Sequence, residues 1–301
     1  MKKIIVEMSK ILITGARSFV GTNFTKFSSN RDISEISLIE NLPEQIDFSI
    51  YDVIIHLVAI VHQSAQIKDD EYFRINRDLC LDVAERARKA GVKQFIFLST
   101  VKVYGEYNPN SGPWNEDSVC TPDDSYGKSK YEAELELRKM ETTDFTVSII
   151  RTPLVYGVGV KANMLSILKL VDMFPVLPLA NVHNKRSFTS AENLVAFIDC
   201  IIQKRASGVF IAMDEKPLST TELVNMISKY LNKKVYLFRM PAFLVRIGKA
   251  WIPKIFDRLY GSFEMDNSKT IGTLNFSPPL SAEEGIQRMV ASYIQNKTAD
   301  N

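Results

Sequence analysis

Short apolar runs alternate with helical patterns along the first half of the chain. The runs are ILIT at 11–14, DVIIHLVA at 52–59, QFIFLST at 94–100 and TVSIIRTPLVYG at 146–157. They are rich in branched and aromatic residues, which is typical of strands buried on both faces of a parallel sheet. Between two of them, in residues 73–92, apolar residues recur every three or four positions until Gly91, as in an amphipathic helix. This alternation predicts an α/β fold, a Rossmann-type doubly wound parallel sheet with a small C-terminal substrate-binding lobe.

The order of the patterns also predicts the domain organisation. We expect a dinucleotide-binding Rossmann domain at 1–156 and 188–213, and a substrate lobe at 157–187 and 214–301. Between Asp32 and Tyr51 there is room for a short strand, ISLIE at 36–40, but hardly for the further helix and strand of a full Rossmann half. The sheet should therefore have a trimmed edge.

Three later helices are predicted by capping boxes, in which a hydroxyl residue precedes a glutamate by three positions. The pairs are Thr189 with Glu192, Ser219 with Glu222, and Ser281 with Glu284.

Composition narrows the class of protein. Hydrophobic residues make up 46% and charged residues 24%, and the net charge of +2 leaves no broad basic surface for nucleic acid. Cys80, Cys120 and Cys200 are odd in number and widely separated, so we expect no disulfide framework and no metal site. The basic start is interrupted by Glu7 and Lys10, which argues against a signal peptide, and no uncharged run approaches the ~20 residues of a membrane span. A cytoplasmic protein fits best.

The stretch TGARSFVG has the two ends of a dinucleotide-binding glycine turn. Gly15 and Gly21 occupy the first and third glycine positions, and Ser18 replaces the second. The serine hydroxyl can donate to a phosphate provided that Ser18 avoids positive φ. Alone, the motif fits a structural strand-turn-helix equally well. Glu40, 25 residues after Gly15, is a candidate ribose acid that favours NAD, although Arg17 could serve NADP and a solvated loop acid is an equal alternative.

A second chemical signal lies in DDSYGKSKYEAELELRK. Tyr126 and Lys130 are four residues apart on a predicted helix and therefore share one face. A nearby cation lowers the pKa of a phenol from about 10, so we expect Lys130 to make Tyr126 a general acid/base. The strand QFIFLST ends at Ser99 and Thr100, which places a hydroxyl at the carboxyl end of a central strand, where open α/β sheets bind ligands.

With these motifs in order, the chain resembles the extended short-chain dehydrogenase/reductases, the NAD-dependent nucleotide-sugar epimerase/dehydratase family. The resemblance runs over nearly the whole length, through TGARSFVG, HLVA, FRINRDL, FLSTVKVYG, YGKSK, RTPLVYG and NKRSF. Ser18 is a departure from the family's usual TGxxGxxG.

The resemblance implies roles for individual residues. The catalytic residues would be Thr100, Tyr126 and Lys130. The dinucleotide would be lined by Gly15, Arg17, Ser18, Phe19, Val20, Gly21, His56, Ala59, Asn76, Tyr126, Lys130, Pro153 and Val155, with Glu40 as the ribose acid. Substrate would be bound by His62 and Lys102 at the sugar, Asn163 at the nucleotide and Arg186 at the diphosphate. A structural or surface role remains open for each of the last four.

The resemblance further implies the reaction class. The dehydratases of the family have Asp-Glu directly after the threonine, where this chain has Val101 and Lys102, so we exclude a 4,6-dehydratase. The finer pattern is similar to a subgroup of bacterial surface-polysaccharide clusters and implies NAD(P)H-dependent reduction of a UDP-4-keto-6-deoxy-N-acetylhexosamine. The alternative is a UDP-sugar 4-epimerase, and Leu154, standing where epimerases often have asparagine, weakens it modestly. From another class, a non-catalytic nucleotide sensor would have little use for the complete set of catalytic residues.

Two expectations concern partners. Family members often dimerise through the tyrosine helix and the preceding long helix, which implies a homodimer. The segment 239–260 interleaves basic residues (Arg239, Arg246, Lys249, Lys254, Arg258) with apolar ones (Phe243, Leu244, Trp251, Ile255, Phe256). It could lie on a membrane surface, but a helix packed over the substrate lobe with a solvated basic face is the preferred interpretation.

Overall fold

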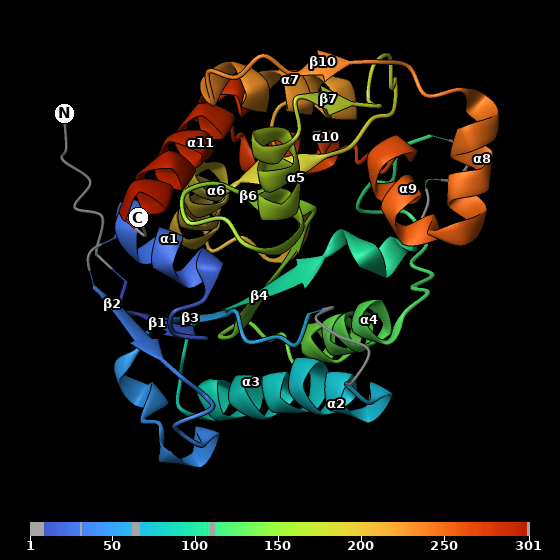
Figure 1. Ribbon diagram of the computed structural model, residues 1–301. Helices are drawn as coiled ribbons and strands as arrows, with labels where there is room; N and C mark the ends of the chain where they lie inside the picture. The colour runs from blue at the N-terminus through green and yellow to red at the C-terminus, as the bar shows by residue number, and fades with distance from the viewer. Residues whose placement is uncertain (1–8, 31, 62–66, 107, 109–111, 300–301) are drawn as a thin grey trace.

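A computed structural model describes residues 9–30, 32–61, 67–106, 108 and 112–299 of the chain. Its centre is a parallel six-stranded sheet in the order β2-β1-β3-β4-β5-β9 (Figure 1). The strands are β1 (Ile11–Thr14), β2 (Ile33–Ile36), β3 (Val53–His56), β4 (Gln94–Thr100), β5 (Thr146–Thr152) and β9 (Gly208–Ile211). The predicted Rossmann-type fold is confirmed.

Helices cover both faces of this sheet, which explains why its strands are apolar throughout. In β1, Ile11 and Ile13 pack in one core with Phe24 and Leu194 of the helices α1 (Phe19–Phe27) and α6 (Ala191–Lys204). The intervening Leu12 faces the other core, with side chains from α3 (Leu79–Lys89) and α4 (Ser125–Lys139). Successive side chains of a strand point to opposite faces, so a run without polar positions requires helices on both sides.

The remaining helices and strands are not part of the six-stranded sheet. They are α2 (Asp69–Phe73), a π-helix (Arg74–Asp78), α5 (Ala162–Met173), α7 (Thr220–Tyr230), α8 (Ala242–Trp251), α9 (Pro253–Tyr260), α10 (Ser268–Leu274), α11 (Ala282–Ala299), β6 (Leu154–Tyr156), β7 (Val176–Leu177), β8 (Phe188–Ser190) and β10 (Tyr236–Leu237). Short 3₁₀ turns occur at Pro43–Gln45, Phe48–Ile50 and Val101–Tyr104.

Two predicted strands differ in detail from the structure. The trimmed edge is confirmed, because β2 is the last strand on its side, but β2 spans 33–36 instead of 36–40. The run 146–157 is two strands, since Pro153 separates β5 from β6. Proline has no N–H for a sheet hydrogen bond, and after it the chain leaves the main sheet to pair with β8.

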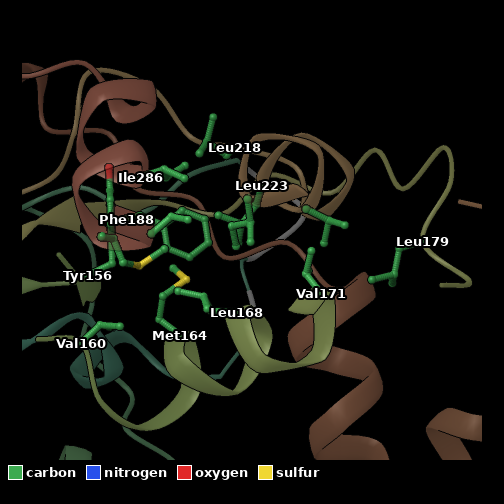
Figure 2. Close-up of a cluster of buried hydrophobic side chains, with 14 of the residues drawn as sticks. Tyr156, Val160, Met164, Leu168, Val171, Leu179, Phe188, Leu218, Leu223 and Ile286 are labelled. Carbon is green, nitrogen blue, oxygen red and sulfur yellow. The ribbon is translucent and has the colours of Figure 1, made fainter. Parts of the chain in front are cut away.

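A third core lies outside the sheet (Figure 2). Met164 and Leu168 of α5, Leu223 of α7 and Ile286 of α11 meet there around Phe188. These helices fall within the segments assigned to the substrate lobe, and the exact division of the chain stays a prediction.

The capping residues match two of the three predictions. Ser219 with Glu222 and Ser281 with Glu284 make reciprocal hydrogen bonds at the starts of α7 and α11. The third pair is wrong by one residue, because Ser190 is the N-cap of α6 and accepts from the N–H of Asn193.

Across the described ranges, every helix is too short or too polar to reach from one side of a bilayer to the other. Within the same ranges, no three His, Cys, Asp or Glu side chains gather into a possible metal site.

Candidate functional site

The turn between β1 and α1 explains how a serine replaces the middle glycine. Gly15 has φ +105°, and a Cβ there would lie 3.2 Å from backbone atoms of Leu57 and Val58. Ser18 has φ −68° and is the N-cap of α1, where its Oγ accepts from the N–H of Gly21 at 3.1 Å. The strained position needs glycine, whereas the middle one has ordinary backbone geometry. Ser18 therefore occupies the middle position without backbone strain, and its negative φ meets the condition set in the sequence analysis.

This turn fits the diphosphate of a dinucleotide. The first turn of α1, which the structure describes throughout, has no acidic residue, and its backbone N–H groups favour an anion. A Cβ on Gly21 would lie 2.8 Å from Ser18 Oγ, so both glycines keep the turn narrow. The Ser18 hydroxyl accepts from the helix and still has its own hydrogen to donate.

The capping role of Ser18 predicts an asymmetry between two substitutions. Ser18→Ala should lose about 1 kcal/mol of unfolding free energy, whereas Ser18→Gly should lose only a few tenths, because glycine is itself an acceptable N-cap. Urea unfolding of both variants beside the wild type measures this. Equal losses in the two variants would contradict the capping role.

The ribose end of the turn differs from the prediction. Because β2 ends at Ile36, Glu40 lies four residues beyond the strand, exposed in a turn. Glu35, within β2, accepts instead from the N–H of Arg17 at 3.1 Å and pairs with Thr25. Arg17 itself is exposed at φ +61°. The structure thus places Glu35, not Glu40, beside the glycine turn.

Two residues predicted to line the dinucleotide are fully buried, which corrects their assignment. His56 lies within β3, 2.8 Å from Thr14 Oγ1 through its Nδ1, and stacks near Phe95 and Phe97. Burial, and then the charge of Lys130, lower the pKa of His56 to about 3, so its ring stays neutral. The side chain is part of the core because β3 has both faces covered.

Asn76 is the second of these buried residues. Its amide nitrogen donates to the carbonyl of Ile60 and to Ser129 Oγ, and its oxygen accepts from the N–H of Ile60. It therefore fixes the loop after β3, which contains the half-buried Ala59, to Ser129 of α4. Asn76 acts on this edge of the site by positioning the loop.

The predicted catalytic hydroxyls come together at the carboxyl end of β4. Thr100 is hydrogen-bonded to Tyr126, which is half-buried in the first turn of α4. Asp124 caps this helix by accepting from the N–H of Gly127 at 2.7 Å. A Cβ on Gly127 would lie 2.9 Å from the carbonyl oxygen of Lys102, so glycine lets α4 approach the end of β4. In YGKSK, the glycine thus allows the close contact between α4 and the end of β4, and the tyrosine and the last lysine are predicted catalytic residues.

The structure does not show the expected effect of Lys130 on the pKa of the phenol. Burial raises the pKa of Tyr126 to about 12, partly offset by the bond with Thr100. The Lys130 ammonium group donates to the carbonyl of Leu98 at 2.9 Å and lies 4.3 Å from the Phe97 ring centroid. The Lys130 charge is directed at this carbonyl and this ring. Because the pKa of Tyr126 is about 12, the phenol keeps its proton at neutral pH.

Lys130 predicts a trade of stability against activity. Burial lowers its pKa from 10.5 to about 8, which corresponds to about 3 kcal/mol against folding below pH 8. The unfolded chain binds more protons between these values, so this cost disappears as the pH rises towards 10.5. After ~1 kcal/mol for the lost bond to Leu98, Lys130→Met should gain about 2 kcal/mol at pH 7 and lose turnover.

Urea unfolding of the cofactor-free proteins, at neutral pH and again near the upper end of this window, measures both terms. The gain should shrink at the higher pH. A variant less stable than the wild type at neutral pH would contradict the argument.

A buried network behind α4 is absent from the sequence prediction. Glu134, one turn beyond Lys130, pairs with Arg151 of β5 at 2.6 Å, and the two side chains are 1% and 5% exposed. Ser99 donates to Glu134, and Arg151 donates to Tyr104 Oη at 2.8 Å. The sequence contained one indication of this network, because Glu134 is four residues after Lys130 and therefore on the same helical face.

The predicted sugar-side residues are only partly described. His62 lies outside the described residues. Lys102 makes ion pairs of 2.6 Å with both Asp124 and Glu106. Burial alone would lower the pKa of Lys102, but these carboxylates outweigh it and raise the value. Lys102 is thus paired with Asp124, the N-cap of α4.

The residues predicted at the nucleotide and diphosphate meet at α9. Arg186 donates to the carbonyls of Asp257 and Gly261 at 3.3 and 3.1 Å, and burial, with the charge of Arg258, lowers its pKa to about 10. Arg258 donates to Asn163 Oδ1 at 3.0 Å. Two guanidinium groups therefore gather where the sequence placed one. The sequence pattern assigns Arg258 only to the amphipathic segment 239–260.

The other residues predicted to line the cofactor lie after β1 and after β5. Phe19 packs against the lobe core and Val20 against the sheet core, so the start of α1 contacts both. Pro153 is buried, and Val155 packs against the sheet core.

A cavity of about 570 Å³ lies elsewhere, between α4, β9 and α10. Its lining includes Glu116, Cys120, Arg151 and Thr270 but none of the predicted site residues. The candidate site is therefore defined by the glycine turn after β1 and the hydroxyl residues at the end of β4, and not by this cavity.

Residues 11–211 match the NAD dependent epimerase/dehydratase family, and this range holds the glycine turn and α4. The chain belongs to this family. NAD is the family's cofactor, in agreement with the fit of the turn. Membership of this family makes the chain an NAD-dependent enzyme of the epimerase/dehydratase type.

Individual relatives cover nearly the whole chain. A UDP-glucose 4-epimerase of Vibrio cholerae is 32% identical, covering 95% of this chain and 95% of its own length. An N-acetyl-α-D-glucosaminyl-diphospho-undecaprenol 4-epimerase of Escherichia coli O157:H7 is 28% identical, covering 79% of this chain and 77% of its own. The solved structure of MoeE5 in complex with UDP-glucose and NAD has a TM-score of 0.73 at 19% identity, covering 96% and 99% of the two chains.

Proposed function

We propose that this enzyme reduces the C4 ketone of a UDP-4-keto-6-deoxy-N-acetylhexosamine, giving a UDP-N-acetyl-6-deoxyhexosamine of the fucosamine or quinovosamine type for surface polysaccharide. The observation that carries this proposal is the placement of Tyr126 beside Thr100 at the carboxyl end of β4, where both hydroxyls can meet one sugar oxygen. Burial raises the pKa of Tyr126 to about 12, so the phenol has a proton to donate. A reduction begins with a proton donor, whereas an epimerisation must first remove a proton from the sugar hydroxyl.

In the proposed reaction the chain's residues handle the proton and the charge. A bound reduced nicotinamide supplies the hydride. Tyr126 donates its proton to the oxygen on C4 as negative charge develops there, and Thr100 orients that oxygen by a second hydrogen bond. Lys130 donates to the carbonyl of Leu98 and, as the resemblance implies, would also hold the nicotinamide ribose.

Leu154 supports the same choice. It stands where epimerases of the family often have asparagine, and its side chain packs against the lobe core. An apolar side chain at this position offers no hydrogen bond to a sugar that must turn between two binding modes.

A second candidate, a 4-epimerase, is favoured by the names of the relatives. Both the Vibrio and the Escherichia coli proteins are 4-epimerases, one of a UDP-sugar and the other of a sugar diphosphate linked to undecaprenol. Epimerisation uses the same three residues but returns the hydride to the same sugar, without consuming cofactor.

The test follows absorbance at the reduced-nicotinamide band while the protein meets UDP-4-keto-6-deoxy-N-acetylglucosamine with NADH or NADPH. We expect loss of reduced cofactor in proportion to ketone reduced. No loss, together with interconversion of UDP-N-acetylglucosamine and its galacto epimer without added reductant, would replace the reductase by the epimerase.

A further inference from the structure

The helices α8 and α9 form a pair that projects at one edge of the molecule, at the right of Figure 1. α8, described at every position, has no buried residue. Trp251 is 83% exposed and Phe243 is 61% exposed. The exposed large apolar side chains of the pair are Phe243, Leu244, Ile247, Trp251, Ile252 and Ile255. The preferred expectation of a helix packed over the substrate lobe is therefore wrong for α8.

The apolar side chains of α8 lie on one stripe. Phe243, Ile247 and Trp251 follow one another at intervals of four residues, so they project from a single helical face. In most surface helices such a stripe faces the protein core. Here it faces outward, and we name it the α8 stripe.

A neighbouring side of α8 packs against α9. A Cβ on Gly248 would lie 2.0 Å from the Phe256 ring, so the glycine forms a notch that receives this ring. Lys249 and Asp257 make an ion pair of 3.3 Å across the two helices. The packing of the pair thus fixes the α8 stripe in its outward orientation.

Basic side chains accompany the α8 stripe. Arg246 lies on α8 and Arg239 lies three residues before its start, and both are exposed. Asp257, the sole acidic residue in the sequence 239–260, is paired with Lys249. The surface therefore joins outward apolar side chains to a positive rim.

We propose that the α8 stripe and its basic rim dock on an anionic lipid membrane surface. A helix that lies in a membrane interface needs an apolar face to enter the acyl boundary and cations to meet the headgroups. Trp251 suits this boundary because the indole has an apolar body and a polar N–H.

A second copy of the chain is a poorer occupant of the same surface. A two-fold contact pairs each patch with itself, so Arg239 and Arg246 of both copies would be brought together. Bringing like charges together raises the free energy of the contact, whereas anionic headgroups neutralise both arginines.

Docking would also orient the candidate site. Asp257 of α9 and Gly261, which follows the helix, supply the carbonyls that hold Arg186, and Arg258 of α9 donates to Asn163. The helix pair that meets the lipid is therefore attached directly to the residues predicted at the diphosphate and the nucleotide. The docking itself depends on none of the proposed chemistry, because binding can be measured without substrate.

The experiment is sedimentation of the full chain with vesicles of phosphatidylglycerol and phosphatidylcholine in equal parts, and with pure phosphatidylcholine. We expect binding to the anionic vesicles that weakens with added salt. Of the two tryptophans, Trp114 is 6% exposed and Trp251 is 83% exposed, so a blue shift of emission on binding reports Trp251.

Matched variants separate the docking surface from general charge. Arg239→Glu/Arg246→Glu should weaken binding at least about tenfold, and Phe243→Ser/Ile247→Ser should abolish the blue shift. Lys26→Glu/Lys204→Glu makes the same charge change at the ends of α1 and α6 and should bind nearly as the wild type.

Three results would overturn the proposal. The first is equal binding to both vesicle types, and the second is equal loss in the docking and control variants. The third is the absence of vesicle binding with self-association that the same docking variants abolish, which would assign the surface to a second copy. Circular dichroism of each variant confirms that it is folded.

Discussion

The Tyr126→Phe variant is expected to lose about a thousandfold in turnover while keeping its fold and its affinity for UDP, because general acid catalysis contributes roughly 10²–10⁴-fold. The substitution removes one oxygen from a half-buried ring and with it the bond to Thr100. It changes neither the glycine turn nor the arginines near α9. The measurement is turnover with the ketosugar under saturating reduced cofactor, beside UDP affinity by calorimetry.

A matched control lies on the same helix. Tyr131→Phe makes the same chemical change five residues later, where Tyr131 packs against Val101, Tyr104 and their neighbours instead of the strand-end site. It should keep turnover within about twofold. Wild-type turnover in Tyr126→Phe would show that Tyr126 is not the acid.

The second large effect is expected on stability, from the pair between Glu134 and Arg151. Removing one partner of a buried ion pair leaves an uncompensated charge and costs about 3–5 kcal/mol. Both side chains are nearly inaccessible, at 1% and 5% exposure. Glu134→Leu should therefore lose this much unfolding free energy in urea, or fail to fold.

The double variant tests the cause. Glu134→Leu/Arg151→Met removes both charges, and apolar replacements of a buried pair are often nearly neutral, so it should recover at least half of the loss. A double variant as unstable as the single would mean that Glu134 acts through packing or through its bond with Ser99.

Local patterns in the sequence predicted much of the fold. Apolar runs such as ILIT and QFIFLST predicted strands because burial on both faces leaves no polar positions. The spacing of Tyr126 and Lys130 predicted one helical face because the helical period acts over a single turn. The boundary of β2 was misplaced because ISEISLIE continues the same pattern past the end of the pairing with β1.

The orientation of single side chains was decided by contacts between distant segments. Asn76 turns towards Ile60 and Ser129, and Arg258 reaches Asn163, across separations that no local period records. The pKa of Tyr126 likewise followed from burial, which a sequence spacing of four residues does not reveal.

The parallel sheet, the glycine turn, and the identity and order of the candidate catalytic residues could be predicted from the order of residues, because these features depend on neighbours along the chain. Three features required the folded chain: that His56 is a core residue, that Lys130 donates to Leu98, and that α8 faces outward. The physical reason is that burial and charge interactions depend on which segments meet in space, and an amphipathic stripe does not specify what will cover it.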